Sequence, residues 1–272
     1  MITSRSNPAV KQIRSLRERK ERDSAGLFFV EGIRLVVEAA QLGAPIQPLV
    51  VAPELLKSPL ALETAQQQRQ KGVSIHEVTA EVFAGLSQKE GPQGIGAVIG
   101  QYWERLDDLG AAKLGWVALD EPQDPGNIGT ILRTADATGC EGVILLGNSA
   151  DPYDPSALRA SMGAIFAQRL VETGFDDLAA WVRMRGVMLV GTSDRAETAY
   201  RAAAAAYRFP LVLLMGSERA GLSAEQQAAC DLVVRMPMLG RSDSLNLAVA
   251  TGVMLYELLG RASESQPPSV TD

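Results

Sequence analysis

Short apolar runs alternate with segments of helical periodicity from residue 114 onward, and this alternation constrains the fold more than any other feature of the sequence. The predicted strands are GWVALD (115–120), GVILLG (142–147), VMLVGT (187–192), PLVLLMG (210–216) and LVVRMP (232–237), with AIFAQRLVE (164–172) as a further candidate. The predicted helices between them cover residues 126–139, 154–162, 176–185, 196–206 and 223–229. This alternation is typical of an α/β fold with a mainly parallel sheet.

A smaller α/β unit precedes this sheet. Its predicted strands cover residues 27–32, 48–54, 73–78 and 94–100, and its predicted helices cover residues 33–43 and 59–72. A chain of 272 residues suits two domains better than one, and residues 101–113 are expected to link them. We therefore predict an N-terminal domain at 1–105 and a larger domain at 114–261. The tail at 262–272 has no hydrophobic periodicity and is expected to be disordered.

The composition argues against several classes of protein. His76 is the only histidine, which disfavours a histidine-based metal site and a Ser–His or Cys–His nucleophile. We predict that no metal is bound and that His76 lies at the surface. Cys140 and Cys230 form no CxxC pair, as expected of a reduced, cytoplasmic protein. The N-terminus lacks an apolar segment of signal-peptide length, and no apolar run reaches about 18 residues, so we predict no membrane span.

Positive charge is concentrated near the N-terminus of a chain whose formal net charge is −6. Residues 5–22, predicted as one basic helix, hold Arg5, Lys11, Arg14, Arg17, Arg19, Lys20 and Arg22 against Glu18 and Glu21. Such a helix either has a solvated face or contacts the phosphates of a nucleic acid. The contrast with the acidic chain favours the second interpretation, with Arg5, Lys11, Arg14 and Arg17 as predicted contacts.

Two common nucleotide-binding loops are not supported. Gly94-x-Gly96 resembles part of a dinucleotide-binding loop, but it follows no predicted strand and opens no helix. The P-loop pattern GxxxxGK[ST] does not occur. A dehydrogenase would also need GxGxxG after the first strand of its sheet, and GWVALDEPQDPGNIG lacks that pattern.

The ends of three predicted strands carry polar residues, and ligands of open α/β sheets bind at such ends. In DEPQDPGNIGTILRTADATG (120–139), Asp124 followed by Pro125 favours a helix start. Arg133 lies off the predicted buried stripe of that helix. It either serves a site or forms a surface pair with Asp136. Asn127 is either a site residue or a plain turn residue.

The second and third strand ends are also polar. LLMGSERAGLS (213–223) contains Gly216, Glu218 and Gly221, which form either a ligand-binding turn or an ordinary tight turn with an exposed glutamate. MPMLGRSDSLNLAVATGVMLYE (236–257) passes through a polar turn into a helix that Ser244 or Asn246 could cap. This helix is apolar nearly all round and is predicted to be buried. Residues at helical spacing in it are Leu245, Ala248, Val249, Gly252, Tyr256 and Leu259.

These three segments, in this order, resemble the motifs of the SpoU (TrmH) family of the SPOUT superfamily. DPGNIGTILRTADATG is similar to the first motif, GSERAGLS to the second, and PMLGRSDSLNLAVATGVMLYE to the third. DPSALRASMGAIF (154–166) is similar to the segment between the first two, and FFVEGIRLV resembles the family's N-terminal substrate-binding domain. The resemblance implies an RNA 2′-O-ribose methyltransferase that binds S-adenosylmethionine, has a C-terminal trefoil knot and forms a homodimer.

The resemblance also implies roles for single residues. Arg133 is the expected catalytic arginine; because a guanidinium stays protonated, we expect it to bind the phosphate beside the target ribose and to stabilise developing negative charge. Asn127, Glu218, Ser244 and Asn246 are expected to orient Arg133 and the ribose. Cofactor-binding positions are implied at Gly216, Met236 and Leu245 for the adenine edge and at Thr192 for the methionine part. Ala248 stands where the third motif often has a second serine, so one hydrogen bond of the family is not expected here.

Three classes of function can be weighed against these residues. A non-catalytic RNA-binding protein on this fold would have lost Arg133, Asn127 or Asn246, and all three are present. A dehydrogenase would lack the three motifs. The separate N-terminal domain and its basic stretch favour a large structured RNA, of the 23S ribosomal type, over tRNA as the substrate. Thiostrepton-resistance methyltransferases share the two-domain layout, so a role in resistance stays open.

Overall fold

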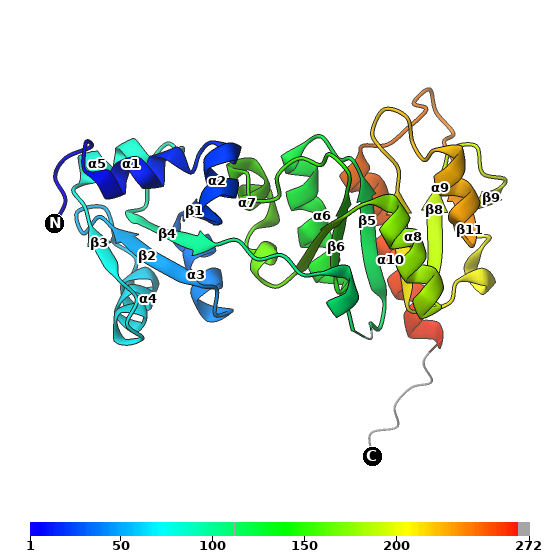
Figure 1. Cartoon of the computed structure of the whole chain (residues 1–272), viewed down its shortest axis with the longest axis horizontal. Coiled ribbons are helices and arrows are strands. Elements are labelled where there is room, and N and C mark those ends of the chain that lie inside the picture. Colours follow the sequence, from blue (N-terminus) through cyan, green and yellow to red (C-terminus); the bar gives the residue numbers. More distant parts are fainter. Residues whose placement is uncertain (111, 266–272) are drawn as a thin grey trace, which may run out of the picture. The chain divides into compact units, whose positions relative to one another are not determined.

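The computed structural model of the chain describes residues 1–110 and 112–265, which form two compact units (Figure 1). The first unit comprises Met1–Tyr102 together with Asp151–Ala167. The second comprises Trp103–Ala150 and the described residues from Gln168 onward. A division of the chain at residue 105 would assign the segment 151–167 to the second unit, whereas its contacts place it in the first.

The first unit contains a four-stranded sheet of order β1-β4-β2-β3, in which only β2 and β3 are parallel. Its strands are β1 (Leu27–Glu31), β2 (Ile46–Val51), β3 (Ile75–Glu77) and β4 (Ile95–Gly100). Its helices are α1 (Pro8–Ser15), α2 (Arg19–Ala25), α3 (Ile33–Gln41), α4 (Pro59–Gln70), α5 (Ala80–Leu86) and α7 (Pro155–Ser161). The sequence did not indicate α5, which is short and begins at the capping hydroxyl of Thr79.

The basic stretch at 5–22 is two helices and not one. The helix α1 ends at Ser15, and α2 begins at Arg19 after Glu18, which has an extended backbone. The prediction of a single basic helix is therefore wrong. Within this stretch, the Arg22 side chain is 2% exposed and pairs with the buried Asp151. A buried guanidinium of this kind cannot contact phosphates.

The second unit contains a seven-stranded sheet of order β7-β6-β5-β10-β8-β11-β9, and every pair of neighbouring strands is parallel. Its strands are β5 (Gly115–Asp120), β6 (Gly142–Leu146), β7 (Arg169–Thr173), β8 (Met188–Thr192), β9 (Thr198–Ala199), β10 (Leu211–Met215) and β11 (Leu232–Arg235). Its helices are α6 (Pro125–Thr138), α8 (Phe175–Arg185), α9 (Ala224–Ala229) and α10 (Leu247–Ser265). The predicted α/β fold with a parallel sheet is confirmed.

The two cysteines lie in this unit and are free thiols. Burial raises the pKa of Cys140 to about 12, and burial together with the neighbouring Asp231 carboxylate raises the pKa of Cys230 to about 12. Both thiols therefore stay protonated near neutral pH and are poor nucleophiles.

The predicted helix at 196–206 does not form, although its five consecutive alanines favour a helix. Thr198 and Ala199 instead pair with Val234 and Arg235 of β11 as the short strand β9. The amide of Tyr200 donates to the carbonyl of Arg235, which continues this pairing. Only Ala204–Ala206 form a 3-10 turn. Pairing with the sheet edge has overridden the local helical preference.

The C-terminal helix α10 packs against α6 and presents one apolar face to solvent. Its buried face comprises Leu247, Ala248, Ala250, Thr251, Met254, Leu255 and Leu258. The prediction that this helix is buried all round is wrong, because Val249, Val253 and Tyr256 are 53%, 37% and 58% exposed. The tail is also helical as far as Ser265, so the prediction of disorder is wrong for 262–265, and residues 266–272 lie outside the described part of the chain.

None of the helices in the described ranges is long and apolar enough to cross a membrane. The trefoil knot implied by the family resemblance stays a prediction.

Candidate functional site

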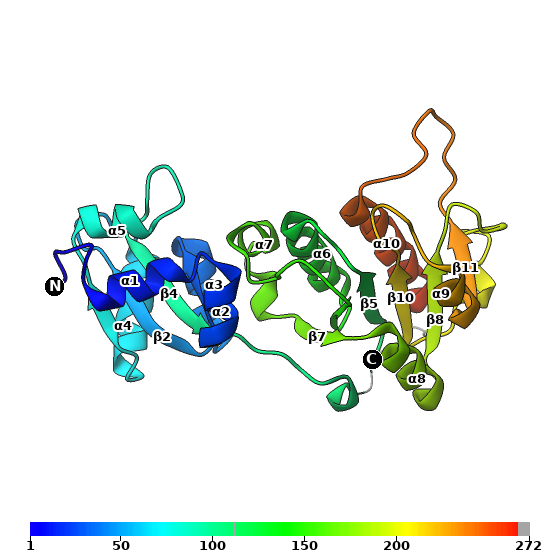
Figure 2. The same cartoon turned by 45° about the horizontal axis from the view of Figure 1, so that its top comes forward.

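Four neighbouring strands of the second unit end at one edge of the sheet. The order β5-β10-β8-β11 places their carboxyl ends next to one another, although they lie far apart in the sequence (Figure 2). The segment after β5 opens α6 with Asn127, the segment after β10 holds Glu218, β8 ends at Thr192, and Met236 follows β11. The fold thus gathers at one edge the segments that the sequence singled out.

Three polar side chains from three different segments form a hydrogen-bonded chain at this edge. The Nδ2 group of Asn127 donates to a carboxylate oxygen of Glu218. The Nδ2 group of Asn246 donates to Oδ1 of Asn127 over 3.0 Å. Asn127 is only 8% exposed, so these bonds satisfy an amide that is otherwise removed from water. Asn127 is therefore more than a turn residue, and Glu218, although exposed, accepts a hydrogen bond from it.

Asn246 also begins the C-terminal helix. Its Oδ1 accepts from the amides of Ala248 and Val249, at 2.9 and 3.3 Å, as a helix N-cap does. Ser244, the alternative cap, instead donates to the neighbouring Asp243 carboxylate over 3.3 Å and is exposed. The structure therefore brings Asn127, Glu218 and Asn246 together but leaves Ser244 outside this chain of hydrogen bonds.

Arg133 lies on α6 with its side chain exposed. The proposed surface pair with Asp136 does not form, and the guanidinium makes no hydrogen bond or ion pair with any residue in the described ranges. An unpaired guanidinium keeps all its donors for an external anion, such as a phosphate.

The turn after β10 is closed by its own backbone. The amide of Ser217 donates to the carbonyl of Gly221 over 3.2 Å, and the amide of Gly221 donates back to Ser217 over 2.9 Å. A Cβ on Gly216 would lie 2.4 Å from the carbonyl carbon of Gly221 and 2.5 Å from the nitrogen of Leu222. Glycine is therefore required at position 216 because the backbone of Gly221 and Leu222 lies too close to leave room for a side chain.

A side chain at position 216 is expected to open this turn. Gly216→Val should destabilise the protein by about 1–3 kcal/mol, as overpacking does, and should displace Glu218 from Asn127. Urea unfolding measures the first effect, and calorimetric titration with S-adenosylmethionine measures whether the displaced turn weakens binding. Gly110→Val is the matched control, because a Cβ there meets nothing within 4 Å. Equal stability of Gly216→Val and the unmutated protein would contradict the expected clash.

The segment between β11 and α10 projects from the sheet edge (Figure 2). Leu239 is 98% exposed and Leu245 is 42% exposed. The backbones of Met236 and Leu245 take part in no hydrogen bond among the described residues. These backbone donors and acceptors therefore remain available for the adenine edge of the predicted cofactor. Thr192, at the end of β8, donates to the sulfur of Met215 over 3.6 Å.

Sequence reasoning missed one acid at this edge. Asp120 is the last residue of β5, and burial raises the pKa of its carboxyl above the ordinary value, while a hydrogen bond from Gln226 of α9 opposes that shift. The position at a strand end was the signal that could have identified it. Gln226 itself is buried and bonded to the amide of Ser223 as part of a capping box.

The four predicted nucleic-acid contacts lie in the first unit, and three of them gather at the C-terminal end of α5. Arg17 donates to the carbonyls of Gly85, Leu86 and Ser87 at 3.1, 2.9 and 3.3 Å. Arg5 and Arg14 lie beside Gly85, at 3.3 and 3.5 Å from the position of a Cβ there. The negative end of the helix dipole stabilises cations placed in this way.

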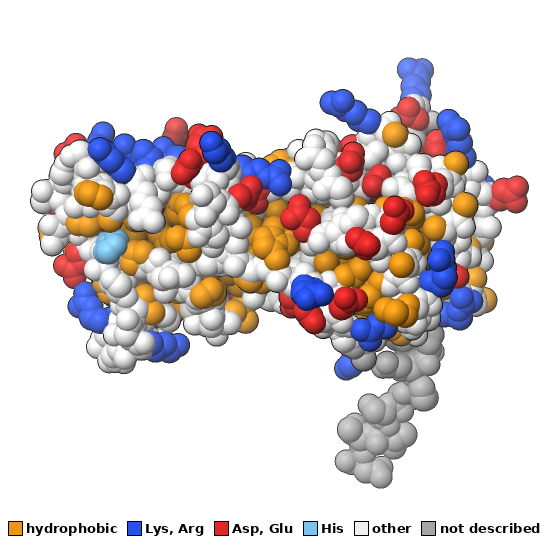
Figure 3. All heavy atoms as spheres, viewed as in Figure 1, with side chains coloured by type: hydrophobic (Ala, Val, Ile, Leu, Met, Phe, Trp, Pro, Cys, Tyr) orange, Lys and Arg blue, Asp and Glu red, His pale blue; other side chains and the backbone are white. Residues whose placement is uncertain are grey.

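Lys11 is the fourth of these residues, and its side chain is exposed on α1. Lys and Arg side chains gather along the edge of the first unit that carries α1 and α2 (Figure 3). Arg5 also pairs with the exposed Glu81 at 3.5 Å. Contact of these residues with RNA stays a prediction.

Sequence patterns of two known families match this chain. The pattern of the SpoU rRNA Methylase family matches residues 116–256, which contain the whole sheet-edge site. The pattern of the MRM3-like substrate binding domain matches residues 7–97, within the first unit. The two matches agree with the resemblance on which the site residues were predicted.

Similar proteins match along nearly their whole lengths. The 23S rRNA (guanosine(2553)-2′-O)-methyltransferase RlmP of Bacillus subtilis is 31% identical over 95% of this chain and 99% of its own. The 23S rRNA (uridine(2479)-2′-O)-methyltransferase of Streptomyces viridochromogenes is 34% identical over 94% of this chain and 90% of its own. The AdoMet-bound rRNA methyltransferase of Sinorhizobium meliloti superimposes with a TM-score of 0.86, at 38% identity, over 94% of this chain and 96% of that one.

Proposed function

Because the chain belongs to the SpoU rRNA methylase family, we propose that it methylates the 2′-hydroxyl of one ribose in ribosomal RNA of the 23S type. As a member of this family the protein is an RNA ribose 2′-O-methyltransferase that uses S-adenosylmethionine. The observation that carries the proposal is the hydrogen-bonded chain of Glu218, Asn127 and Asn246, which joins the three family motifs at one sheet edge.

The predicted site residues have distinct proposed roles. Arg133, unpaired within the described chain, binds the phosphate next to the target ribose and stabilises negative charge that develops on the 2′-oxygen. Asn127 and Asn246 hold Glu218 in place, so that its second carboxylate oxygen can accept a hydrogen bond from the ribose. Ser244, exposed in the segment before α10, is proposed to contact the RNA directly.

The cofactor fits among the backbone groups of the same edge. S-adenosylmethionine, when bound, supplies a methyl group that its sulfonium already activates. Met236 and Leu245 would hold the adenine edge through backbone groups that are otherwise unused in the described chain. Gly216 would shape the turn beside the adenine, and Thr192 would face the methionine part.

The choice of 23S-type RNA rests on the relatives. Both named relatives act on 23S rRNA, but one modifies a guanosine and the other a uridine. The relatives therefore support 23S rRNA as the class of substrate, but they do not identify the nucleotide that is methylated. The unit that matches a substrate-binding domain, with its arginines at 5, 14 and 17, is proposed to hold the RNA. We place the enzyme in the cytoplasm, where bacterial ribosomal RNA is found.

Transfer of tritiated methyl groups from S-adenosylmethionine to total RNA tests the proposal. The RNA should come from a strain that lacks this gene, so that the target ribose is unmodified. We expect label at one ribose of 23S rRNA. Label in tRNA would keep the reaction and overturn the proposed substrate. Tight cofactor binding with no transfer to naked RNA or to ribosomal subunits would support a non-catalytic RNA-binding protein.

We also propose that the enzyme is a homodimer and that the exposed stripe of α10 is its interface. Val249, Val253 and Tyr256 of α10, together with Leu245 two residues before the helix, recur at helical spacing and are 37–58% exposed. An apolar stripe on an α-helix that no other part of the described chain covers is typical of an association surface. The stripe starts beside Asn246, so a partner seated there would also cover the third motif.

A charge in this stripe is expected to separate the subunits. Val249→Glu should shift the mass measured by light scattering from that of a dimer to that of a monomer, because an unpaired carboxylate would be buried at the interface. Leu62→Glu is the control: Leu62 is 50% exposed on α4 in the first unit and lies outside the stripe. A monomeric unmutated protein, or a Val249→Glu variant that remains dimeric, would contradict this interface.

A further inference from the structure

One acid at the sheet edge has no role in the proposed mechanism. Asp120 is the last residue of β5, and its side chain is partly buried. The residue before it, Leu119, pairs with Met215, which Gly216 follows. Because the two strands are parallel, Asp120 lies beside the start of the turn at 216–222.

No cation among the described residues pairs with the carboxyl of Asp120. Its partner across the sheet is the apolar Leu146 of β6, and the other neighbouring strand, β10, ends at Met215. Burial raises the pKa of Asp120 above the ordinary value, a hydrogen bond from Gln226 of α9 lowers it, and the Glu121 carboxylate raises it. The bond from Gln226 is therefore the interaction that stabilises the charged form.

The side chain of Gln226 is a buried polar group with partners at both ends. Only 8% of the residue is exposed. Its Oε1 accepts from the amide of Ser223 over 2.8 Å, which completes the capping box at the start of α9. Its side-chain nitrogen donates to the carboxyl of Asp120. The amide is thus satisfied as a buried polar group requires, and it connects two segments that lie far apart in the sequence.

Gln226 also holds the end of the turn. Ser223, whose amide it binds, directly follows Leu222, which is 5% exposed. The side chain of Gln227 donates to the carbonyl of Leu222 over 2.9 Å, so α9 binds two successive residues of the chain. A shift of Gln226 would therefore move the end of the turn at 216–222.

The turn at 216–222 is joined at two places to the end of β5 and the segment that follows it. Within the turn, the Glu218 carboxylate accepts from Asn127. At the end of the turn, Gln226 provides the connection to Asp120. A single hydrogen bond would leave the turn free to pivot, whereas bonds at two separate points fix its orientation, as supporting contacts do around a binding site.

We propose that Asp120 is a positioning residue for methyl transfer: through Gln226, it holds the turn at 216–222 in the orientation that binds S-adenosylmethionine and directs Glu218 toward the ribose. This inference rests on the proposed function, because it takes the turn to be part of the site for methyl transfer. Asp120 itself contacts neither the cofactor nor the RNA. Its carboxylate accepts a charge-assisted hydrogen bond, which is stronger than a bond between neutral groups.

Gln226→Glu tests the connection to Asp120 by itself. The introduced carboxylate can still accept from the amide of Ser223, so that bond of the capping box is kept, but its second oxygen meets Asp120 and repels it. Titration calorimetry at about pH 8 should show an affinity for S-adenosylmethionine about tenfold lower than that of the unmutated protein. At about pH 6 the difference should shrink to less than about threefold, because two facing carboxyl groups share a proton and a hydrogen bond between them forms.

A double variant reverses the polarity of this hydrogen bond. When Asp120→Asn is combined with Gln226→Glu, the introduced amide donates to the introduced carboxylate. The affinity for S-adenosylmethionine at about pH 8 should then return to within about threefold of that of the unmutated protein. Gln66→Glu is the matched control, because it adds the same charge at an exposed glutamine of α4 in the first unit, and it should leave this affinity unchanged.

Hydrogen exchange in the cofactor-free protein gives a second measurement. The amide of Gly221 donates to the carbonyl of Ser217 across the turn, and at about pH 8 it should exchange about tenfold faster in Gln226→Glu than in the unmutated protein. Three results would each overturn the proposal: unchanged cofactor affinity in Gln226→Glu, a loss of affinity that is equal at both pH values, or a double variant that binds no better than Gln226→Glu.

The proposed function and this inference fail in different ways. Methyl transfer to 23S rRNA by the unmutated protein, with no effect of Gln226→Glu on cofactor binding or exchange, would leave the reaction standing and remove Asp120 from it. A pH-dependent loss of affinity that the double variant restores, with no methyl transfer to any RNA by the unmutated protein, would support the connection and overturn the proposed reaction.

Discussion

Replacing Arg133 with alanine is expected to lower methyl transfer to ribosomal RNA by a factor of roughly 10²–10³ and to leave the affinity for S-adenosylmethionine unchanged. Arg133 is exposed and has no partner in the described chain, so the loss would come from missing contacts with RNA and with developing charge, and not from misfolding. The measurement is the initial rate of tritium transfer at saturating cofactor, with cofactor affinity determined separately by calorimetry.

Two further variants distinguish charge from geometry at this position. Arg133→Lys should retain part of the activity if a positive charge is sufficient, and almost none if two parallel hydrogen bonds to a phosphate are needed. Arg183→Ala is the matched control, because Arg183 is an exposed arginine on α8 of the same unit. If Arg133→Ala transferred methyl groups at the rate of the unmutated protein, Arg133 would have no role in the reaction, and the proposed mechanism would be wrong.

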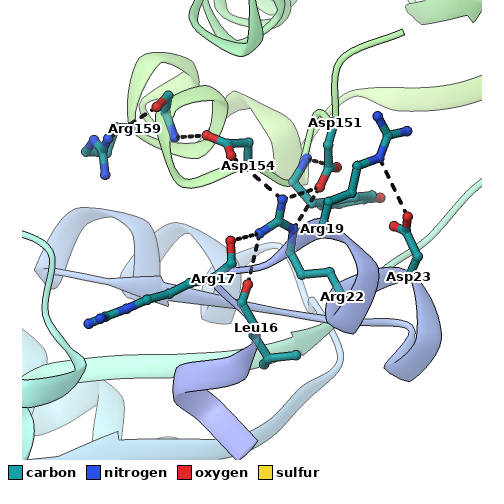
Figure 4. Close-up of polar contacts among 10 residues, drawn as sticks. Leu16, Arg17, Arg19, Arg22, Asp23, Asp151, Asp154 and Arg159 are labelled. Carbon is teal, nitrogen blue, oxygen red and sulfur yellow. Dashed lines mark hydrogen bonds and ion pairs between the residues drawn. The ribbon is translucent and has the colours of Figure 1, made fainter. Parts of the chain in front are cut away.

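Replacing Arg22 with methionine should destabilise the first unit by about 3–5 kcal/mol. The Arg22 side chain is 2% exposed, and the Asp151 side chain with which it pairs is 6% exposed (Figure 4). Removing the cation would leave a buried carboxylate without a counter-charge, together with unpaired carbonyls at Leu16 and Arg17. Scanning calorimetry of the full chain measures the effect as a lower transition temperature of the first unit.

A double variant tests the electrostatic cause. When Arg22→Met is combined with Asp151→Asn, neither member of the pair is charged. The side-chain oxygen of the introduced asparagine can still accept from the Tyr153 amide, so more than half of the lost stability should return. Arg69→Met, at an exposed ion pair with Glu77, should change stability by less than about 1 kcal/mol. An Arg22→Met variant as stable as the unmutated protein would show that the pair contributes nothing.

Local patterns in the sequence predicted the strands of the seven-stranded sheet except β9, which falls in a segment predicted as helix. Alternating apolar runs predicted the strands of the parallel sheet because each buried strand reads as a short continuous apolar segment. Asn127, Glu218 and Asn246 were predicted from the resemblance of three distant segments to family motifs, and the neighbouring ends of β5, β10, β8 and β11 bring those segments together. These three side chains were therefore predicted without knowledge of the fold.

The tertiary structure alone decided which face of α10 is buried and where α7 belongs. A helix with apolar residues on every side gives no local signal for its inner face, and packing against α6 selected the side of Met254 and Leu258. Likewise, nothing near Arg22 in the sequence distinguishes it from Arg17 or Arg19, because its partner Asp151 is 129 residues away. The burial of a side chain and its pairing partner depend on contacts between residues that are distant in the sequence. The residues next to it in the chain therefore do not reveal either.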